Sequence, residues 1–368
     1  MLRQGRAILV QLRSGITHWH TRRYDMAISY LTDMRNINGA PITPKHYNDQ
    51  IKVARHADDL GYKTVWVPED HCMDDGFCPA PLTTLAAFAR ETKRIRLGTG
   101  IVQVPTIHPR RIFEEACIVD VMSNGRMTLG VGTGGYELEY KAFGVPWKER
   151  GKLMEEHVKF IKQGFAGGPL PDGLPTVVAP VQRPIPILGG TKSQAATDRS
   201  ARLMEGNFAT THMDHEQELG KFWNEWLSPS LKRHGRKVSE FQLPLMSTVW
   251  ASEKYMDDWH DFVGPGFIYR KNKYEVGWEK VGKDYKGASS QFREWDEAEE
   301  GGAEEMVPRM LIDTPKNIAA RLKKLRTIYP FDEFVIMKIQ GIPQEQFIKQ
   351  LTLFREQIAP IVFPEKKW

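Results

Sequence analysis

Short runs of β-branched and apolar residues alternate with longer segments of helical period along nearly the whole chain. This alternation favours a parallel sheet whose strands are joined by covering helices. The predicted strands are 7–12, 64–67, 95–102, 127–131, 185–188, 206–210, 243–250 and 333–339. The predicted helices are 44–60, 81–90, 109–122, 149–165, 193–204, 214–234, 314–325 and 344–358. Eight such units predict a (β/α)₈ TIM barrel rather than a doubly wound sheet, which usually carries fewer strands.

The alternation fails between residues 252 and 312, a stretch crowded with charged and aromatic side chains. We interpret this stretch as an insertion after the seventh strand of a single barrel domain, residues 1–368. A dinucleotide-binding sheet would need a glycine fingerprint after its first strand. The sequence GITHWHTRRYD after the predicted strand 7–12 has none.

The charge balance and the cysteines limit the kinds of partner and compartment. With 51 Lys and Arg against 46 Asp and Glu, the formal charge is +5, and no basic block with interleaved aromatics indicates a nucleic-acid partner. Cys72, Cys78 and Cys117 do not suggest a disulfide framework, and their spacing matches no usual zinc site. No cleavage pattern follows the first apolar run, and no apolar stretch reaches the roughly 20 residues of a membrane helix. We therefore expect a cytoplasmic protein with no membrane span and no metal.

Side chains immediately after strands are the active-site candidates, because the βα loops of a barrel converge on one face. His71 follows the second predicted strand and His212 follows the sixth. Imidazole titrates near neutrality, so we predict catalytic acid–base roles for both. His18 and His20, after the first predicted strand, are weaker candidates.

Three further strand ends leave two interpretations open. The ends 132–136 (GTGGY) and 189–193 (GGTKS) are rich in glycine, which lets main-chain N–H groups approach an anion at a helix N-terminus. The same glycines would also simply let a strand turn into its helix. The pair Glu69-Asp70 suits acid–base chemistry and equally suits holding its loop by main-chain hydrogen bonds.

Several stretches match, in order, the pattern of a known family. They are ARHADDLGYKTVWVPEDH, RIRLGTGIVQVPTIHP, SNGRMTLGVGTGGYELEYKAFGVPWKERGKLMEE, PIPILGGTKSQAATDRSARLMEGNF, TPKNIAARLKKL and FDEFVIMKI. These stretches resemble the bacterial-luciferase-like flavin-dependent monooxygenases. They span about 51–206 and 314–339, roughly half of the chain, and the block around 125–150 is the most specific.

The resemblance implies a (β/α)₈ barrel, usually a homodimer, that binds reduced FMN (FMNH₂) or, in a sister branch, the deazaflavin F420. It assigns Gln103 to the flavin ring. It places Gly132, Thr133 and Tyr136 in the loop that lines the flavin. It places Gly189, Gly190 and Thr191 in the loop that holds the flavin phosphate. His71 matches the usual acidic-histidine ending of the second strand, although this chain reads EDH where EHH is common.

The resemblance also implies an activity. It indicates an FMNH₂-dependent monooxygenase that inserts one oxygen atom from O₂ into a small organic substrate through a flavin hydroperoxide. A separate NAD(P)H:flavin reductase would supply the reduced cofactor. The insertion 252–312 resembles a mobile loop that closes over the flavin and excludes water. Arg270 or Lys271 in this loop would supply positive charge. The alternatives are a surface extension for the insertion, and F420-dependent hydride transfer or flavin binding without catalysis for the activity.

Overall fold

Parallel strands at the centre of the computed structural model pair in a closed ring. The structure describes residues 27–35, 42–72, 75–176, 178–211, 215–271 and 307–366. In these residues the strands follow one another in the order β10, β1, β2, β3, β5, β6, β7 and β8, and β10 also pairs with β8, which closes the ring. The pairings are parallel throughout. The predicted (β/α)₈ barrel is confirmed.

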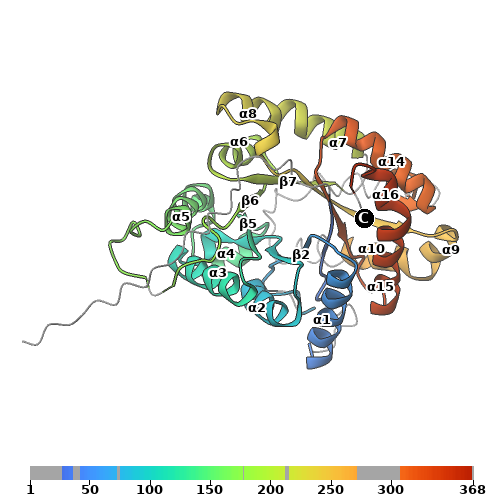
Figure 1. The fold of residues 1–368 in the computed structure, drawn as a ribbon, viewed down its shortest axis with the longest axis horizontal. Coiled ribbons are helices and arrows are strands. Elements are labelled where there is room, and N and C mark those ends of the chain that lie inside the picture. Colours follow the sequence, from blue (N-terminus) through green and yellow to red (C-terminus); the bar gives the residue numbers. More distant parts are fainter. Residues whose placement is uncertain are drawn as a thin grey trace, which may run out of the picture.

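The helices form an outer layer around this ring. The barrel strands are β1 (Ala27–Leu31), β2 (Thr64–Val67), β3 (Arg96–Thr99), β5 (Met127–Gly132), β6 (Ile187–Gly190), β7 (Gly206–Thr211), β8 (Pro244–Ala251) and β10 (Glu333–Met337). The covering helices are α1 (Pro44–Asp59), α2 (Pro81–Glu91), α3 (Pro109–Ser123), α5 (Arg150–Phe165), α6 (Gln194–Leu203), α7 (His215–Lys221), α8 (Ser228–Arg233), α14 (Pro315–Ile328), α15 (Gln344–Leu353) and α16 (Ala359–Val362). Figure 1 shows these helices arranged around the strands.

Successive residues of a strand face alternately the inside of the barrel and the surrounding helices. A small apolar cluster fills the inside, made up of Leu31, Trp66, Leu188, Phe208, Met246 and Val335. Trp66 meets Phe208 edge to face, with ring centroids 4.8 Å apart. A much larger apolar cluster joins the outer side of the strands to the helices. Because the barrel is packed below its rim, a ligand has room only at an end of it.

Local sequence signals set the helix boundaries. Pro44 and Pro315 stand at the first position of α1 and α14, where their lack of an N–H costs nothing. Helix α3 ends at Ser123 and is capped by Asn124, which adopts the left-handed conformation with a φ of 56°. Gly61, with a φ of 78°, likewise follows the end of α1 in a conformation that favours glycine. Within the described residues, no helix combines the length and the apolar character needed to cross a bilayer.

The first barrel strand lies further along the chain than predicted. Residues 7–12 lie outside the described residues, and the strand that pairs with both β10 and β2 is β1, all of it buried. Both segments are short apolar runs, and periodicity alone does not separate two such runs. The prediction that His18 and His20 follow the first barrel strand is therefore wrong, and Thr32 and Asp33 follow it instead.

Two other predictions differ from the structure near the barrel rim. The third predicted strand, 95–102, is divided into β3 and the short β4 (Val102–Gln103), which pairs with β5. The fifth strand begins after Pro186, which has no N–H to donate to a sheet, so Gly189 and Gly190 end β6 rather than follow it. A short helix, α4 (Glu137–Ala142), was not predicted.

The structure describes both ends of the predicted insertion after β8, and the insertion itself stays a prediction. It opens with α9 (Tyr255–Asp258), a π-helical turn (Trp259–Val263) and α10 (Gly264–Lys271). It closes with β9 (Leu311–Asp313), which pairs in parallel with the end of β8. Residues 272–306 lie outside the described residues.

Candidate active site

The carboxyl ends of β2, β4, β5 and β6 carry most of the predicted site residues. His71 follows β2, and Gln103 ends β4. Gln103 pairs with Gly132 on β5, and the preceding residue of β5, Val131, pairs with Gly189 on β6. The predicted residues from His71 to Gly189 therefore form one arc along a single rim of the barrel.

Two buried glutamates link His71 to Gln103. Glu69 Oε1 lies 3.2 Å from His71 Nε2, and Glu69 Oε2 accepts a hydrogen bond from the main-chain N–H of Gln103. Glu139 Oε1 accepts hydrogen bonds from the main-chain N–H of His71 and from Nε2 of Gln103, both at 2.8 Å. Both glutamates are buried, so their hydrogen bonds are strong and poorly replaced by water. Glu69 thus holds its loop by a main-chain hydrogen bond, one of the two interpretations that the sequence left open.

Sequence reasoning missed Glu139, which belongs to α4. The signal was the stretch ELEYKA, in which Glu137 and Glu139 occupy the first helical turn and stabilise a helix N-terminus. Tyr136 is the N-cap residue of this helix, and the Tyr140 hydroxyl donates a hydrogen bond to the main-chain oxygen of Thr133. Thr133 and Tyr136 therefore lie in the turn that joins β5 to α4, beside the arc.

Asp70, the neighbour of Glu69, is buried without a cation bound to it in the described residues. Burial raises the pKa of Asp70 to about 9, and a hydrogen bond with Glu139 and the negative charge of Glu139 add to the rise. The positive charge of Arg35 acts against it. The two carboxyl groups that the sequence presented as a pair therefore have different surroundings: Glu69 contacts His71 and Gln103, whereas Asp70 contacts Glu139.

The side-chain oxygen of Gln103 has no hydrogen-bond partner among the residues that the structure describes, although it is buried. A Cβ added at Gly134 would lie 2.3 Å from this Oε1 atom, and Gly134 has a φ of +70°. Only glycine suits that turn. A buried acceptor without a donor is costly, and a ligand N–H at this position would remove the cost.

The side chain of Ile101 explains two of the predicted glycines. A Cβ added at Gly132 would lie 2.8 Å from Ile101 Cδ1, and one at Gly190 would lie 2.7 Å from Ile101 Cγ2. At Gly189 an added Cβ would lie 2.5 Å from Ser200 Oγ. Packing therefore accounts for the absence of side chains at these positions, and their contact with a phosphate stays a prediction.

The loop after β6 leads directly into α6. The Thr191 hydroxyl lies 3.0 Å from that of Thr197 and accepts a hydrogen bond from Nδ2 of Asn207, also at 3.0 Å. Ser193 caps α6 by accepting a hydrogen bond from the main-chain N–H of Ala196. The loop is thus fixed at the N-terminus of a helix, where an anion is stabilised.

The side chains of two predicted catalytic residues fall outside the description. His212 lies outside the described residues, and Arg270 belongs to α10, whose main chain is described. Helix α10 contacts the barrel rim at two places. The Tyr269 hydroxyl donates a hydrogen bond of 3.0 Å to Oδ2 of Asp75, a residue of the loop after β2. Gly266 packs against Gln340, which follows β10: a Cβ added at Gly266 would lie 2.2 Å from the main-chain oxygen of Gln340.

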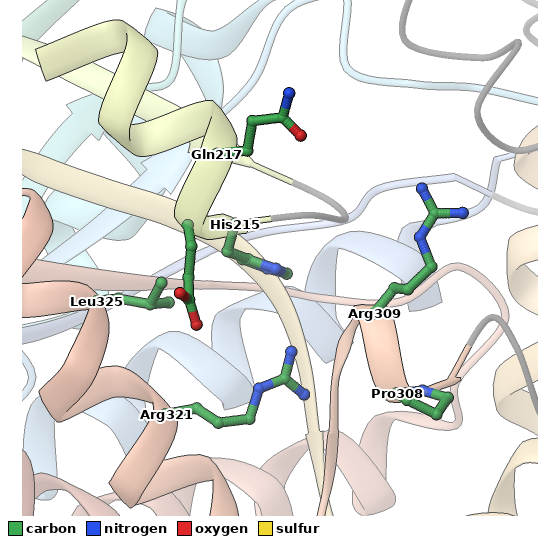
Figure 2. A pocket seen from close by; sticks show the side chains of 7 residues that line it. His215, Gln217, Pro308, Arg309, Arg321 and Leu325 are labelled. Atoms are coloured by element: carbon green, nitrogen blue, oxygen red, sulfur yellow. The ribbon is translucent and has the colours of Figure 1, made fainter. Parts of the chain in front are cut away.

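A cavity of about 310 Å³ lies between α7 and α14 (Figure 2), lined by His215, Glu216, Gln217, Pro308, Arg309, Arg321 and Leu325. His215 Nε2 lies 2.9 Å from Ser247 Oγ on β8. The preceding residue, Met246, belongs to the cluster inside the barrel, so Ser247 faces the helices. This cavity therefore lies on the outer side of the barrel wall, apart from the arc of predicted site residues.

A family model described as luciferase-like monooxygenase matches residues 26–330 of the chain. The oxygenase component of flavin-dependent trigonelline monooxygenase from Acinetobacter baylyi is 31% identical over 144 residues, which cover 39% of this chain and 40% of that protein. The chain thus matches less than half of the length of this curated relative.

Two solved structures share the fold. The oxygenating constituent of 3,6-diketocamphane monooxygenase from Pseudomonas putida, in complex with FMN, is 15% identical, with 92% of this chain and 98% of that one covered and a TM-score of 0.74. The F420-dependent tetrahydromethanopterin reductase from Methanopyrus kandleri is 16% identical, with 91% and 99% covered and a TM-score of 0.65. At these identities the likeness shows the barrel architecture alone.

Proposed function

The chain belongs to the luciferase-like monooxygenase family, and on that basis we propose that it is the oxygenase component of a two-component flavin-dependent monooxygenase. In this proposal it uses FMNH₂ and O₂ to insert one oxygen atom into a small organic substrate. The trigonelline relative is itself an oxygenase component, and the diketocamphane enzyme was solved with FMN, which supports the choice of cofactor and reaction.

The buried Oε1 atom of Gln103 is the observation that carries the proposal. It offers an acceptor at the carboxyl rim, and the isoalloxazine ring carries an N–H at N3 and, once reduced, another at N5, so the residues present fit this cofactor. When bound, the flavin would supply the reaction with oxygen. Gln103 would orient the ring because Glu69 and Glu139 fix both its main chain and its amide. The N-terminus of α6 would hold the phosphate.

His71 is the acid–base group of the proposed site. Its ring is held between two neighbours, Glu69 Oε1 at 3.2 Å from Nε2 and the ring of Phe143, whose centroid is 4.7 Å away. A carboxylate beside an imidazole fixes its orientation and favours a proton on the facing nitrogen. His71 can therefore hold or move a proton at the rim.

Apolar side chains at the rim support an organic substrate of low polarity. Ile101 and Met337 pack on the interior cluster but are partly exposed. They offer an apolar surface beside the polar arc of Glu69, Gln103 and Glu139, an arrangement typical of ligand sites. The proposed substrate would lie on this surface while the flavin contacts Gln103.

Hydride transfer with F420 is the second candidate function, because the reductase from Methanopyrus kandleri shares the barrel. The two functions differ in their need for oxygen. A monooxygenase consumes O₂ and transfers one of its atoms to the product, whereas hydride transfer consumes none.

Two partners belong to the proposal. A separate NAD(P)H:flavin reductase would supply FMNH₂, as the term oxygenase component indicates for the trigonelline relative. A second copy of the chain would cover part of α3, where Ile118 and Val121, one turn apart, are each 48% exposed.

The test is an anaerobic titration of the protein with FMNH₂ and, separately, with reduced F420, followed by ¹⁸O₂ and candidate substrates. We expect saturable FMNH₂ binding and one ¹⁸O atom in the product. Gln103→Ala should bind FMNH₂ about tenfold more weakly, the effect of one buried hydrogen bond. Turnover with F420 and without O₂ uptake would instead establish the second candidate.

A further inference from the structure

Two acidic side chains from different elements meet beneath the link between His71 and Gln103. Asp70 follows β2 and is 9% exposed, and Glu139 lies on α4 and is 0% exposed. The two side chains are within hydrogen-bonding reach of each other. A pair of buried carboxyl groups this close cannot easily carry two negative charges, because burial removes most of the solvation that would stabilise both.

The hydrogen bonds of Glu139 and Asp70 leave one place where a proton is needed. Glu139 Oε1 already accepts two hydrogens, from the main-chain N–H of His71 and from the Gln103 amide. The other oxygen, Glu139 Oε2, is buried and meets no donor within the described part of the chain, and the same holds for Asp70 Oδ1. Both atoms are acceptors when both groups are ionised. One proton between them turns an electrostatic repulsion into a hydrogen bond.

We propose that Asp70 keeps one proton at neutral pH and donates it to Glu139 Oε2, so that the pair carries a single negative charge and positions His71 and Gln103. The pair is a positioning unit rather than a catalytic group, because it acts through the two residues that Glu139 binds. The proposal rests on the proposed function only for the identity of the ligand that His71 and Gln103 would contact.

The charged and titratable groups around the pair are consistent with one retained proton. Arg35, after β1, lowers the pKa of Asp70, but it is bound to Asp33 at 2.6 Å. Burial raises the pKa of the Cys72 thiol, and the charges of Glu139 and Asp70 add to the rise. Burial also raises the pKa of Tyr140, where Arg150 acts against the rise and Glu139 adds to it. Glu69 and His71, on the same loop as Asp70, complete the surroundings. Burial and Glu139 together outweigh Arg35 in the net rise of the Asp70 pKa.

The net charge of the Asp70–Glu139 pair affects how an anion approaches the rim. Glu69, Asp70 and Glu139 would place three negative charges beside Gln103 if all were ionised. A phosphorylated flavin is an anion, and its approach would then be opposed. A shared proton removes one of these charges and leaves the hydrogen bonds from Glu139 to His71 and Gln103 in place.

Infrared spectroscopy of the ligand-free protein tests the proton directly. A protonated carboxylic acid has a carbonyl stretching band that shifts in D₂O, and wild type should show it at neutral pH from a buried group. Asp70→Asn should lose this band while its amide donates to Glu139 Oε2 in place of the acid. Glu139→Gln is the second variant: burial, the largest cause of the raised pKa of Asp70, remains, so the band should persist but shift in frequency because the hydrogen-bond partner of the acid has changed. Asp198→Asn, on the surface of α6, is the matched control and should keep the band.

The pH dependence of unfolding is the second readout. Asp70 has a raised pKa in the folded state, so its contribution to stability is complete at acidic pH and is lost as pH rises towards the folded pKa. The unfolding equilibrium constant of wild type, divided by that of Asp70→Asn, should rise about tenfold per pH unit between about pH 5 and about pH 8. A ratio independent of pH, or a band that persists in Asp70→Asn, would overturn the proposal. Neither measurement uses flavin, so a failure here is distinct from a failure of the proposed function.

Discussion

His71, in the loop after β2, and Gln103, at the end of β4, are joined twice, through Glu69 and through Glu139, by hydrogen bonds to main chain and side chain alike. A double link of this kind restrains both the position and the orientation of the two residues. Substitutions can therefore change the site in two ways, at His71 and Gln103, which would contact a ligand, or at Glu69 and Glu139, which hold them in position.

Replacing His71 by Gln should lower the rate of turnover by a factor of about 10² to 10⁴, the usual contribution of a general acid or base. Binding of FMNH₂ should change little, because the main-chain N–H of residue 71 still donates to Glu139. Single-turnover kinetics and a binding titration separate the two effects. His234→Gln, on the protein surface beside Asp198, is the control. Equal activity of His71→Gln and wild type would remove His71 from the catalytic group.

Adding a methyl group at Gly190 should destabilise the fold by about 1–3 kcal/mol, because the new Cβ would overlap Ile101. Chemical denaturation of Gly190→Ala, of Ile101→Ala and of the double variant measures the coupling between the two positions. The double variant should be more stable than the sum of the single changes predicts. Gly135→Ala is the control, since nothing lies within 4 Å of a Cβ at that position. Strict additivity would show that Ile101 is not the reason for glycine at residue 190.

The α3 surface predicts the oligomeric state. If a second copy covers Ile118 and Val121, the double change Ile118→Asp and Val121→Asp should halve the mass measured by light scattering, because burying two carboxylates in an apolar interface is costly. Val238→Asp introduces a charge at a comparably exposed apolar residue elsewhere and should leave the mass unchanged. A wild-type protein that is monomeric at all concentrations would contradict the proposed homodimer.

Helix α10 should detach more readily from the rim when Tyr269 is replaced by Phe. The change removes the hydrogen bond to Asp75, worth about 1 kcal/mol, so the rate of proteolytic cleavage within the insertion should rise about fivefold. Tyr47→Phe, at an exposed position of α1, should leave the cleavage rate unchanged. If both variants are cut at the wild-type rate, the contact does not hold the helix.

Much of the barrel could be predicted from the sequence, because parallel strands that are buried on both faces leave continuous apolar runs. Thr64–Val67 and the helix that starts at Pro44 match their predictions closely. The first strand could not be placed, since the apolar runs 7–12 and Ala27–Leu31 carry the same local signal and only the pairing with β10 and β2 distinguishes them.

The candidate site was predictable in part for a related reason. His71 lies in the loop after β2 and Gln103 ends β4, and the carboxyl ends of barrel strands meet on one rim, so their proximity follows from the fold. Glu139 belongs to a helix of six residues, too short for a periodic signal, and its contacts with both residues depend on the path of the turn after β5. The role of Ile101 was equally hidden, because the glycines that accommodate it come from two different strands.

The insertion is joined to the barrel near each of its ends, by α10 at the rim and by the pairing of Leu311 with Val249 on β8. Helix α10 thus reaches from the loop after β2 to the residues after β10. A displacement of this helix would be passed to the loop that also carries His71. Substitutions in α10 can therefore alter the rim without any change in a barrel strand.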